Sequence, residues 1–179
     1  MSWRAGIHGY VARWGVVTAP LSRPAAPHLS RPARFERDCF SYDASAVEIW
    51  FMHREAQAVG LGADLDLEIW PDAYGLAFAF KPPTSAWNLV CGVAEGRYDQ
   101  CSAGFGIGDR TVERHGSLVF DSISYAALRE ISICPRGACP GAICWHAGNG
   151  PAAISRAAKI LLPGWTRSRA AHSIAALAG

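Results

Sequence analysis

Residues 64–81, DLDLEIWPDAYGLAFAFK, decide the fold class. Leucine and isoleucine alternate with acidic residues over 65–69, and large and small apolar residues alternate over 76–80. The segment PDAYG between them carries the proline and glycine that are typical of a turn. Alternation with a period of two on both sides of a turn predicts an antiparallel hairpin with one buried face.

The segments around this hairpin predict more strands and one helix. Apolar and β-branched runs predict short strands, whereas residues 54–62 and 108–117 are expected to be loops; the strand segments are 5–14, 45–52, 98–107, 117–124 and 125–134. Residues 84–96 change to helical spacing, and Gly96 is suited to end a helix there. We therefore predict an α+β domain, mainly an antiparallel β-sheet or β-barrel with a central helix.

The chain has 179 residues, a length that suits one domain. We place that domain at residues 1–150, with a proline-rich, poorly packed loop at 15–35. Residues 151–179 are rich in Ala and Arg and are expected to form a helical or disordered tail. Residues 1–34 carry a net charge of +5, residues 35–150 of −7 and residues 151–179 of +4.

This charge pattern and the hydropathy exclude several classes of protein. A nucleic-acid-binding module that uses the two basic ends of the chain is a second alternative. The acidic central domain lacks the basic, aromatic surface of such a module, so a nucleic-acid partner is not expected. No apolar run is long enough for a transmembrane helix. The N-terminus lacks the continuous apolar segment of a secretory signal, and we expect a cytoplasmic protein without a membrane partner.

The chain contains six cysteines, and without a secretory signal we expect them to be reduced thiols. Cys134, Cys139 and Cys144 are evenly spaced, with His146 close behind. Zinc sites use shorter Cys-x-x-Cys pairs and need four ligands, so small buried thiols are the favoured interpretation and no metal is expected.

Three residues supply the chemistry of a serine hydrolase. Ser102 lies among small residues in QCSAGF, His53 follows the apolar segment IWFM, and Glu130 lies in LREISI. A serine hydroxyl needs an imidazole to accept its proton, and a carboxylate can orient that imidazole. Taken singly, each has a structural alternative: a bulge serine, a surface histidine and an edge carboxylate. The Gly-x-Ser-x-Gly elbow of α/β-hydrolases is only half present, because Gln100 replaces its first glycine.

The order of these segments resembles the prohead proteases of tailed bacteriophages, which are distantly similar in fold to the herpesvirus assembly protease. The resemblance covers about residues 6–143 and depends on the series IHGYVARW, IWFMH, PDAYGLAFAF, a helix ending in AEG, CSAGF and LREIS. The chain departs from the family pattern in its proline-rich segment before the His strand, in Arg54 after the histidine and in Cys101 before the serine.

The resemblance implies a serine endopeptidase with Ser102 as nucleophile, His53 as general base and Glu130 as third member, with Asp99 as the competing acid. It implies no cofactor. It also implies that the protein acts inside a procapsid in the bacterial cytoplasm, where it cleaves scaffold and major capsid protein and processes itself. The alternative is a catalytically inactive, β-rich phage or prophage assembly protein.

Overall fold

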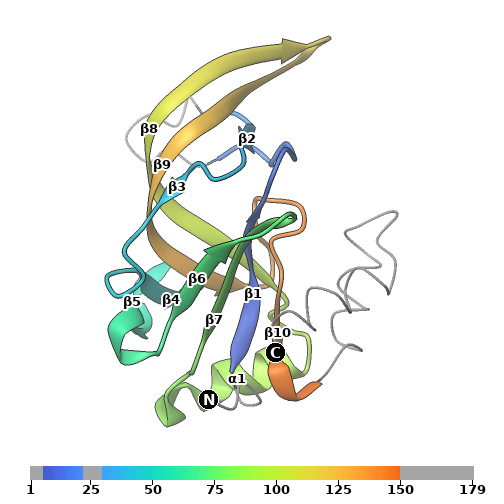
Figure 1. Ribbon diagram of the computed structural model, residues 1–179. Helices are drawn as coiled ribbons and strands as arrows, with labels where there is room; N and C mark the ends of the chain where they lie inside the picture. Colours follow the sequence, from blue (N-terminus) through green and yellow to red (C-terminus); the bar gives the residue numbers. More distant parts are fainter. Residues whose placement is uncertain (1–5, 22–29, 150–179) are drawn as a thin grey trace.

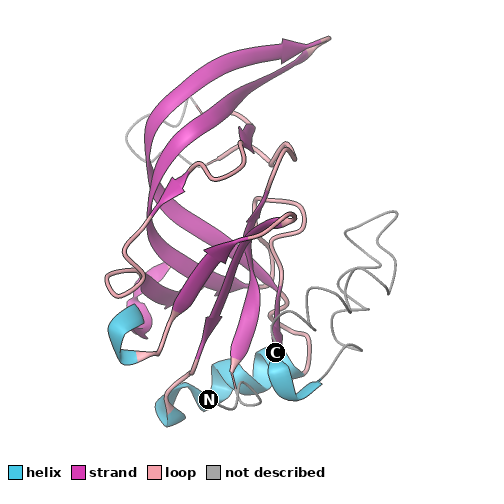
Figure 2. Ribbon diagram, in the orientation of Figure 1, coloured by secondary structure: helices cyan, strands magenta, loops and turns pink. Residues whose placement is uncertain are grey.

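The computed structural model describes residues 6–21 and 30–149, which form two packed β-sheets and one short helix (Figures 1 and 2). The helix is α1 (Trp87–Ala94), and 3₁₀ turns lie at Gly62–Asp64, Thr84–Ala86 and Ala147–Asn149. The strands are β1 (Ile7–Arg13), β2 (Ala33–Phe35), β3 (Phe40–Ser41), β4 (Glu48–Phe51), β5 (Arg54–Leu61), β6 (Glu68–Pro71), β7 (Gly75–Phe80), β8 (Gln100–His115), β9 (Leu118–Cys134) and β10 (Cys144–His146).

The predicted hairpin is present as β6 and β7, which pair antiparallel with Ile69 opposite Phe78. It belongs to a four-stranded sheet in the order β10-β1-β7-β6. The first strand begins at Glu68 rather than at residue 64, because a 3₁₀ turn precedes it. The expectation of one buried face is wrong for β7, which is buried along both faces. As an inner strand, β7 turns Phe78 to the main core and Ala77 to a second apolar cluster.

The second sheet has six strands and is built around β9. The strand β8 pairs antiparallel with β9 along one edge, whereas β2, β3 and β4 pair in parallel with the other edge. Our prediction of an antiparallel sheet is therefore wrong for this edge. Residues 33–51 run beside β9 as one interrupted strand, with Ala33 opposite Asp121 and Glu48 opposite Glu130.

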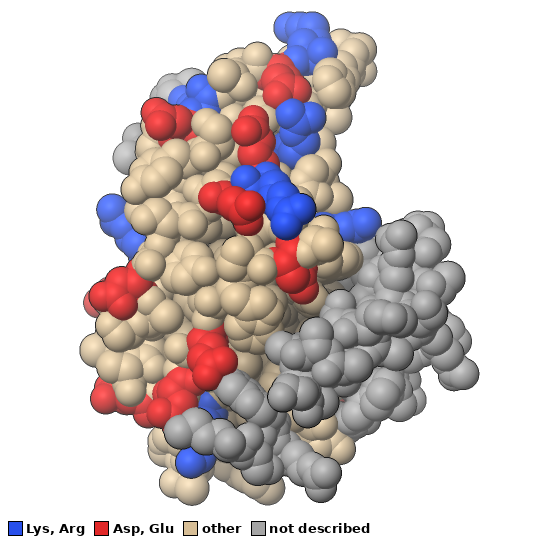
Figure 3. Space-filling model, viewed as in Figure 1, with Lys and Arg blue, Asp and Glu red and all other residues tan. Residues whose placement is uncertain are grey.

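The β8–β9 hairpin is much longer than predicted. Residues 108–117, expected to be a connection, continue β8 to His115, and the two strands expected over 117–134 are one strand. The sequence pattern failed here because the far end of the hairpin extends beyond the core (Figure 1) and exposes side chains such as Val112, which is 60% exposed. We call residues 107–123 the arm; acidic and basic side chains are interspersed along its surface (Figure 3).

Residues 54–61 form strand β5 rather than the loop predicted there. The strand pairs with β4, and most of its side chains are exposed. Pairing through the backbone at a sheet edge requires no alternation of apolar residues, so the pattern carried no signal for this strand.

The proline-rich segment 15–35 packs better than predicted in the part that the structure describes. The N–H of Thr18 donates to the carbonyl oxygen of Ala33 at 2.7 Å, and the Thr18 hydroxyl accepts from the Ala33 N–H at 3.0 Å. Phe35 is buried in the core. Residues 22–29 of the predicted loop and the predicted tail at 151–179 lie outside the described residues.

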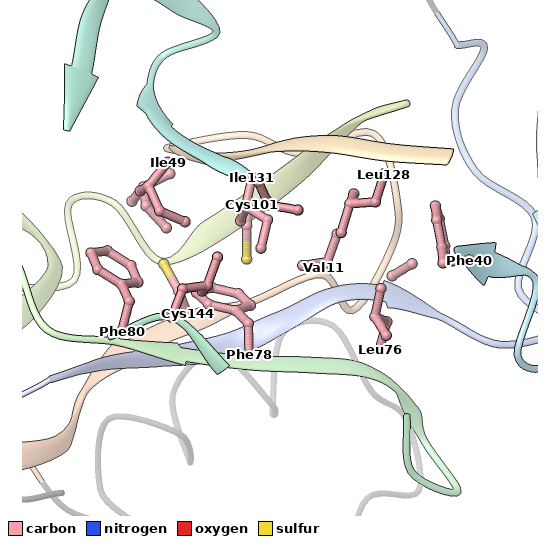
Figure 4. Close-up of a cluster of buried hydrophobic side chains, with 14 of the residues drawn as sticks. Val11, Phe40, Ile49, Leu76, Phe78, Phe80, Cys101, Leu128, Ile131 and Cys144 are labelled. Atoms are coloured by element: carbon pink, nitrogen blue, oxygen red, sulfur yellow. The ribbon is translucent and has the colours of Figure 1, made fainter. Parts of the chain in front are cut away.

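The core lies between the two sheets (Figure 4). Val11 and Phe78 reach it from the four-stranded sheet, and Ile49, Cys101 and Ile131 reach it from the other. The predicted helix is confirmed as α1, and Gly96 follows it at a φ of +74°. The strand pairings of the described residues give two sheets and no closed barrel. Within those residues, no helix has the length and apolar character to cross a membrane.

Candidate functional site

The candidate site lies on the outer face of the six-stranded sheet, opposite the core. Cys101 is fully buried in the core, and alternation along β8 turns the next residue, Ser102, to the other face. Ser102 lies directly opposite Ser132 of β9, which in turn is paired with Trp50 of β4. The register therefore places one residue from each of three neighbouring strands in a row on the same face, with Ser102 at one end of the row.

The next row on this face contains Glu130. Gly104 of β8 lies opposite Glu130, which is two residues before Ser132 on β9 and shares its face. One carboxylate oxygen, Oε2, accepts a hydrogen bond of 2.6 Å from the Ser132 hydroxyl, and the other, Oε1, lies 3.1 Å from Nδ1 of His53. Each oxygen of the carboxylate thus has its own partner.

His53 reaches Glu130 from a tight turn between β4 and β5. Phe51 and Arg54 are paired across the two strands, so Met52 and His53 form a two-residue loop, and both have positive φ values, 58° and 56°. A type I′ hairpin turn requires positive φ at both of its central residues, and Asn and Gly are the preferred residues there. Methionine and histidine in this conformation store backbone strain, a feature that clusters at functional sites.

The hydrogen bond with Glu130 favours one tautomer of neutral His53. A carboxylate accepts hydrogen bonds, so this tautomer carries its proton on Nδ1 and leaves Nε2 as the acceptor nitrogen. The same hydrogen bond raises the pKa of His53 above its ordinary value of 6.5, and partial burial opposes the increase. The imidazole is 46% exposed while the carboxylate side chain is 8% exposed, so the base is accessible and its partner is shielded.

Ser102 is half-buried on this face. Within residues 6–21 and 30–149, its hydroxyl makes no hydrogen bond, to His53 or to any other group. In enzymes without substrate, the bond between nucleophile and base is often long and tightens when substrate binds. Ser132 is fully buried and donates to Glu130, so Ser102 is the more accessible of the two serines.

The competing acid, Asp99, lies before β8. Its backbone oxygen accepts a hydrogen bond from the N–H of Cys144, and burial raises the pKa of its carboxyl group. The only carboxylate within hydrogen-bond distance of His53 among the described residues is that of Glu130. The geometry therefore favours Glu130 over Asp99 as the partner of the imidazole.

The six cysteines are free thiols, and five of them are buried. Burial raises the pKa of Cys134 to about 11 and that of Cys39 to about 12, so both stay protonated. The thiols of Cys134 and Cys144 donate to backbone carbonyl oxygens. The described part of the chain contains no cluster of three or more side chains suited to hold a metal ion.

The sequence alone assigned no role to the side chain of Ser132 or to the absence of a side chain at Gly104. The β8–β9 register places Ser132 opposite Ser102 and Gly104 opposite Glu130. The signal for Ser132 was its spacing of two residues from Glu130 within a strand, which puts both side chains on one face.

The comparison with known protein families matches the part of the chain that forms the candidate site. The family model of the caudovirus prohead serine protease matches residues 3–147, which include the row with Ser102, the turn with His53 and the strand with Glu130. A search of the curated proteins finds no match. Because the family model covers most of the sequence, the resemblance seen in the segment order is confirmed, and the chain belongs to the family of caudovirus prohead serine proteases.

Proposed function

We propose that this protein is a serine endopeptidase in which Ser102, His53 and Glu130 are the catalytic residues. The observation that carries the proposal is the hydrogen-bonded chain from His53 through Glu130 to Ser132, on the same face as the accessible Ser102. Family membership supports a protease role in capsid maturation.

In the proposed reaction, Oγ of Ser102 attacks the carbonyl carbon of the scissile peptide bond while Nε2 of His53 accepts the hydroxyl proton. Glu130 holds the imidazole by Nδ1 and stabilises its protonated form. The imidazolium then donates the proton to the leaving amine, and the acyl group remains on Ser102. A water molecule, deprotonated by His53, attacks this acyl-enzyme and releases the second product.

The oxyanion of the tetrahedral intermediate needs hydrogen-bond donors close to Ser102. The N–H of Cys101 points away from β9, because it donates to the carbonyl oxygen of Ala142. N–H groups alternate in direction along a strand, so the N–H of Ala103 also points away from β9. We therefore assign the N–H of Ala103 as a donor to the oxyanion.

The proposed substrates are the scaffold and major capsid protein of a procapsid, together with the enzyme itself. The support for these substrates is the family, whose members are prohead proteases. Cleavage would then take place inside the procapsid, in the cytoplasm of the bacterial host.

The proposal is tested by coexpressing the full chain with its cognate capsid precursor. The wild type is expected to shorten the capsid protein, and Ser102→Ala and His53→Ala are expected to abolish this cleavage. The control is Ser122→Ala, which removes a buried serine hydroxyl from the same sheet, far along β9 from the site. Cleavage that persists in Ser102→Ala would favour the alternative of an inactive assembly protein.

A further inference from the structure

Glu130 is enclosed by the strand that carries the nucleophile. Gly104 of β8 lies opposite it, and a Cβ atom at Gly104 would lie 2.5 Å from both Cγ and Oε1 of Glu130. Real Cβ atoms essentially never approach another heavy atom so closely. Gly104 is not one of the residues with positive φ, so the position requires space for Glu130 rather than the torsional freedom of glycine.

The Glu130 side chain cannot move aside without losing its contacts. Its Oε1 is the atom that holds Nδ1 of His53, and its Oε2 is held by the Ser132 hydroxyl. An alanine methyl group at 104 would push against the same Oε1 atom. The clash would therefore be relieved by displacing the oxygen that orients the imidazole.

Ser132 fixes the other side of the carboxylate. It is fully buried, and its 2.6 Å hydrogen bond leaves Oε1 as the oxygen available to His53. A hydrogen bond to a charged group contributes more than one between neutral groups, and a carboxylate held at both oxygens cannot rotate about its terminal bond.

We infer that Ser132 and Gly104 are positioning residues for the catalytic carboxylate: Ser132 anchors Oε2 of Glu130, and Gly104 leaves the space that Cγ and Oε1 occupy. This inference rests on the proposed function, because it assigns the two residues to the same site. Neither residue touches the reacting atoms in this role; both act on His53 through Glu130.

The test compares Gly104→Ala and Ser132→Ala in the full-length protein with two matched controls. Gly106→Ala adds the same methyl group on β8, where the nearest atom is the flexible Arg129 guanidinium at 3.4 Å. Ser122→Ala removes an equally buried hydroxyl that also donates to a carboxylate, that of Glu36. The probe is a fluorophosphonate, and its second-order rate of labelling of Ser102 reports the activated nucleophile.

We expect Gly104→Ala to slow labelling by about 10²-fold, the scale on which a displacement of about 1 Å affects catalysis. We expect Ser132→Ala to slow it by about tenfold, with partial recovery in Ser132→Thr, which retains a hydroxyl. Both controls are expected to react at the wild-type rate. If Gly104→Ala does not fold, the comparison of Ser132→Ala with Ser132→Thr still decides the inference.

A second measurement does not depend on turnover. Titration of His53 by NMR should show its pKa lowered toward the ordinary value in Gly104→Ala, because the contact with Glu130 is disturbed, and unchanged in Gly106→Ala. Wild-type labelling together with wild-type titration of His53 in Gly104→Ala would overturn the inference. If the wild type itself shows no labelling that depends on Ser102, the proposed function fails, and the titration alone decides the positioning role.

Discussion

Strand β9 carries two buried serines, Ser132 and Ser122, that each donate a hydrogen bond to a carboxylate. The carboxylates and their other partners form two clusters, which we call the site cluster and the arm cluster, and the two differ in burial and in the type of basic residue. In the site cluster, Ser132 donates to the buried Glu130, which holds the imidazole of His53. In the arm cluster, Ser122 donates to the exposed Glu36 at 2.9 Å and accepts from the Arg34 guanidinium, which also pairs with Glu113.

The difference shows how the same pair of side chains serves architecture in one place and is suited to chemistry in another. The two hydrogen bonds of the Arg34 guanidinium, to Glu113 and Ser122, tie the segment before β3 to the arm. The imidazole of His53 can change its protonation, its pKa is raised above the ordinary value of 6.5 by the hydrogen bond with Glu130, and Nε2 takes no part in that bond. A buried carboxylate with a titratable partner is the combination that acid–base catalysis requires.

The largest difference between the clusters is expected in the labelling rate of Ser102 when the glutamate of each cluster is replaced by glutamine. Glu130→Gln should slow labelling of Ser102 by about 10²-fold or more, because the amide can no longer hold the imidazole with Nδ1 protonated and stabilise its charge. Glu36→Gln should react at the wild-type rate. The labelling rate is measured for both variants, with circular dichroism to verify that they are folded.

Equal rates in these two variants would contradict the distinction between the clusters. A folded Glu130→Gln that reacts as the wild type would show that its carboxylate serves the architecture alone, like that of Glu36. Asp99→Asn should then be examined as the competing acid.

A smaller effect is expected in the pH dependence. The general base must be neutral, so labelling should increase as pH increases through the raised pKa of His53. In Glu130→Gln the midpoint should move to lower pH, toward about 6.5, because the hydrogen bond that raises the pKa is weakened. A midpoint that stays in place in this variant would show that another group sets it.

The raised pKa of His53 also predicts how the stability of the fold depends on pH. A pKa raised in the folded state means that protonated His53 stabilises the fold, an effect fully present below about pH 6.5 and lost as pH increases through the folded pKa. The wild type should therefore exceed His53→Gln in free energy of unfolding by more at about pH 6 than at about pH 9. Arg34→Gln should show no such dependence, because arginine does not titrate in this range.

The sequence was informative where side chains are buried in alternation. Leu76 and Phe78 predicted β7, the apolar run before His53 predicted β4, and the segment order identified the family. It was uninformative where pairing leaves side chains exposed, as in β5 and in the arm around Val112.

The sequence supplied the residue types of the proposed site but not their contacts. Ser102, His53 and Glu130 were selected by their chemistry and order in the chain. The roles inferred for Ser132 and Gly104 depend on which residue of β8 lies opposite which residue of β9, and the bulge after Gly104 shifts that register. A single sequence does not contain this pairing information, since it arises only when both strands are in place.

The smallest effect is expected from backbone strain, which also separates the two clusters. Near the arm cluster the non-glycine residue with positive φ is Asp38, at 59°, and aspartate tolerates this conformation. In the site the residues are Met52, at 58°, and His53, at 56°, and methionine does not tolerate it. Met52 is 37% exposed, so part of its buried apolar surface is lost when it is replaced, and this loss opposes the gain from the turn. Met52→Asn should still increase the free energy of unfolding, by up to about 1 kcal/mol, because Asn is preferred at this position of a type I′ turn. Urea denaturation measures the change, with Asp38→Asn as the control that should gain nothing. A Met52→Asn protein no more stable than the wild type would show that the turn bearing His53 holds its positive φ values without strain.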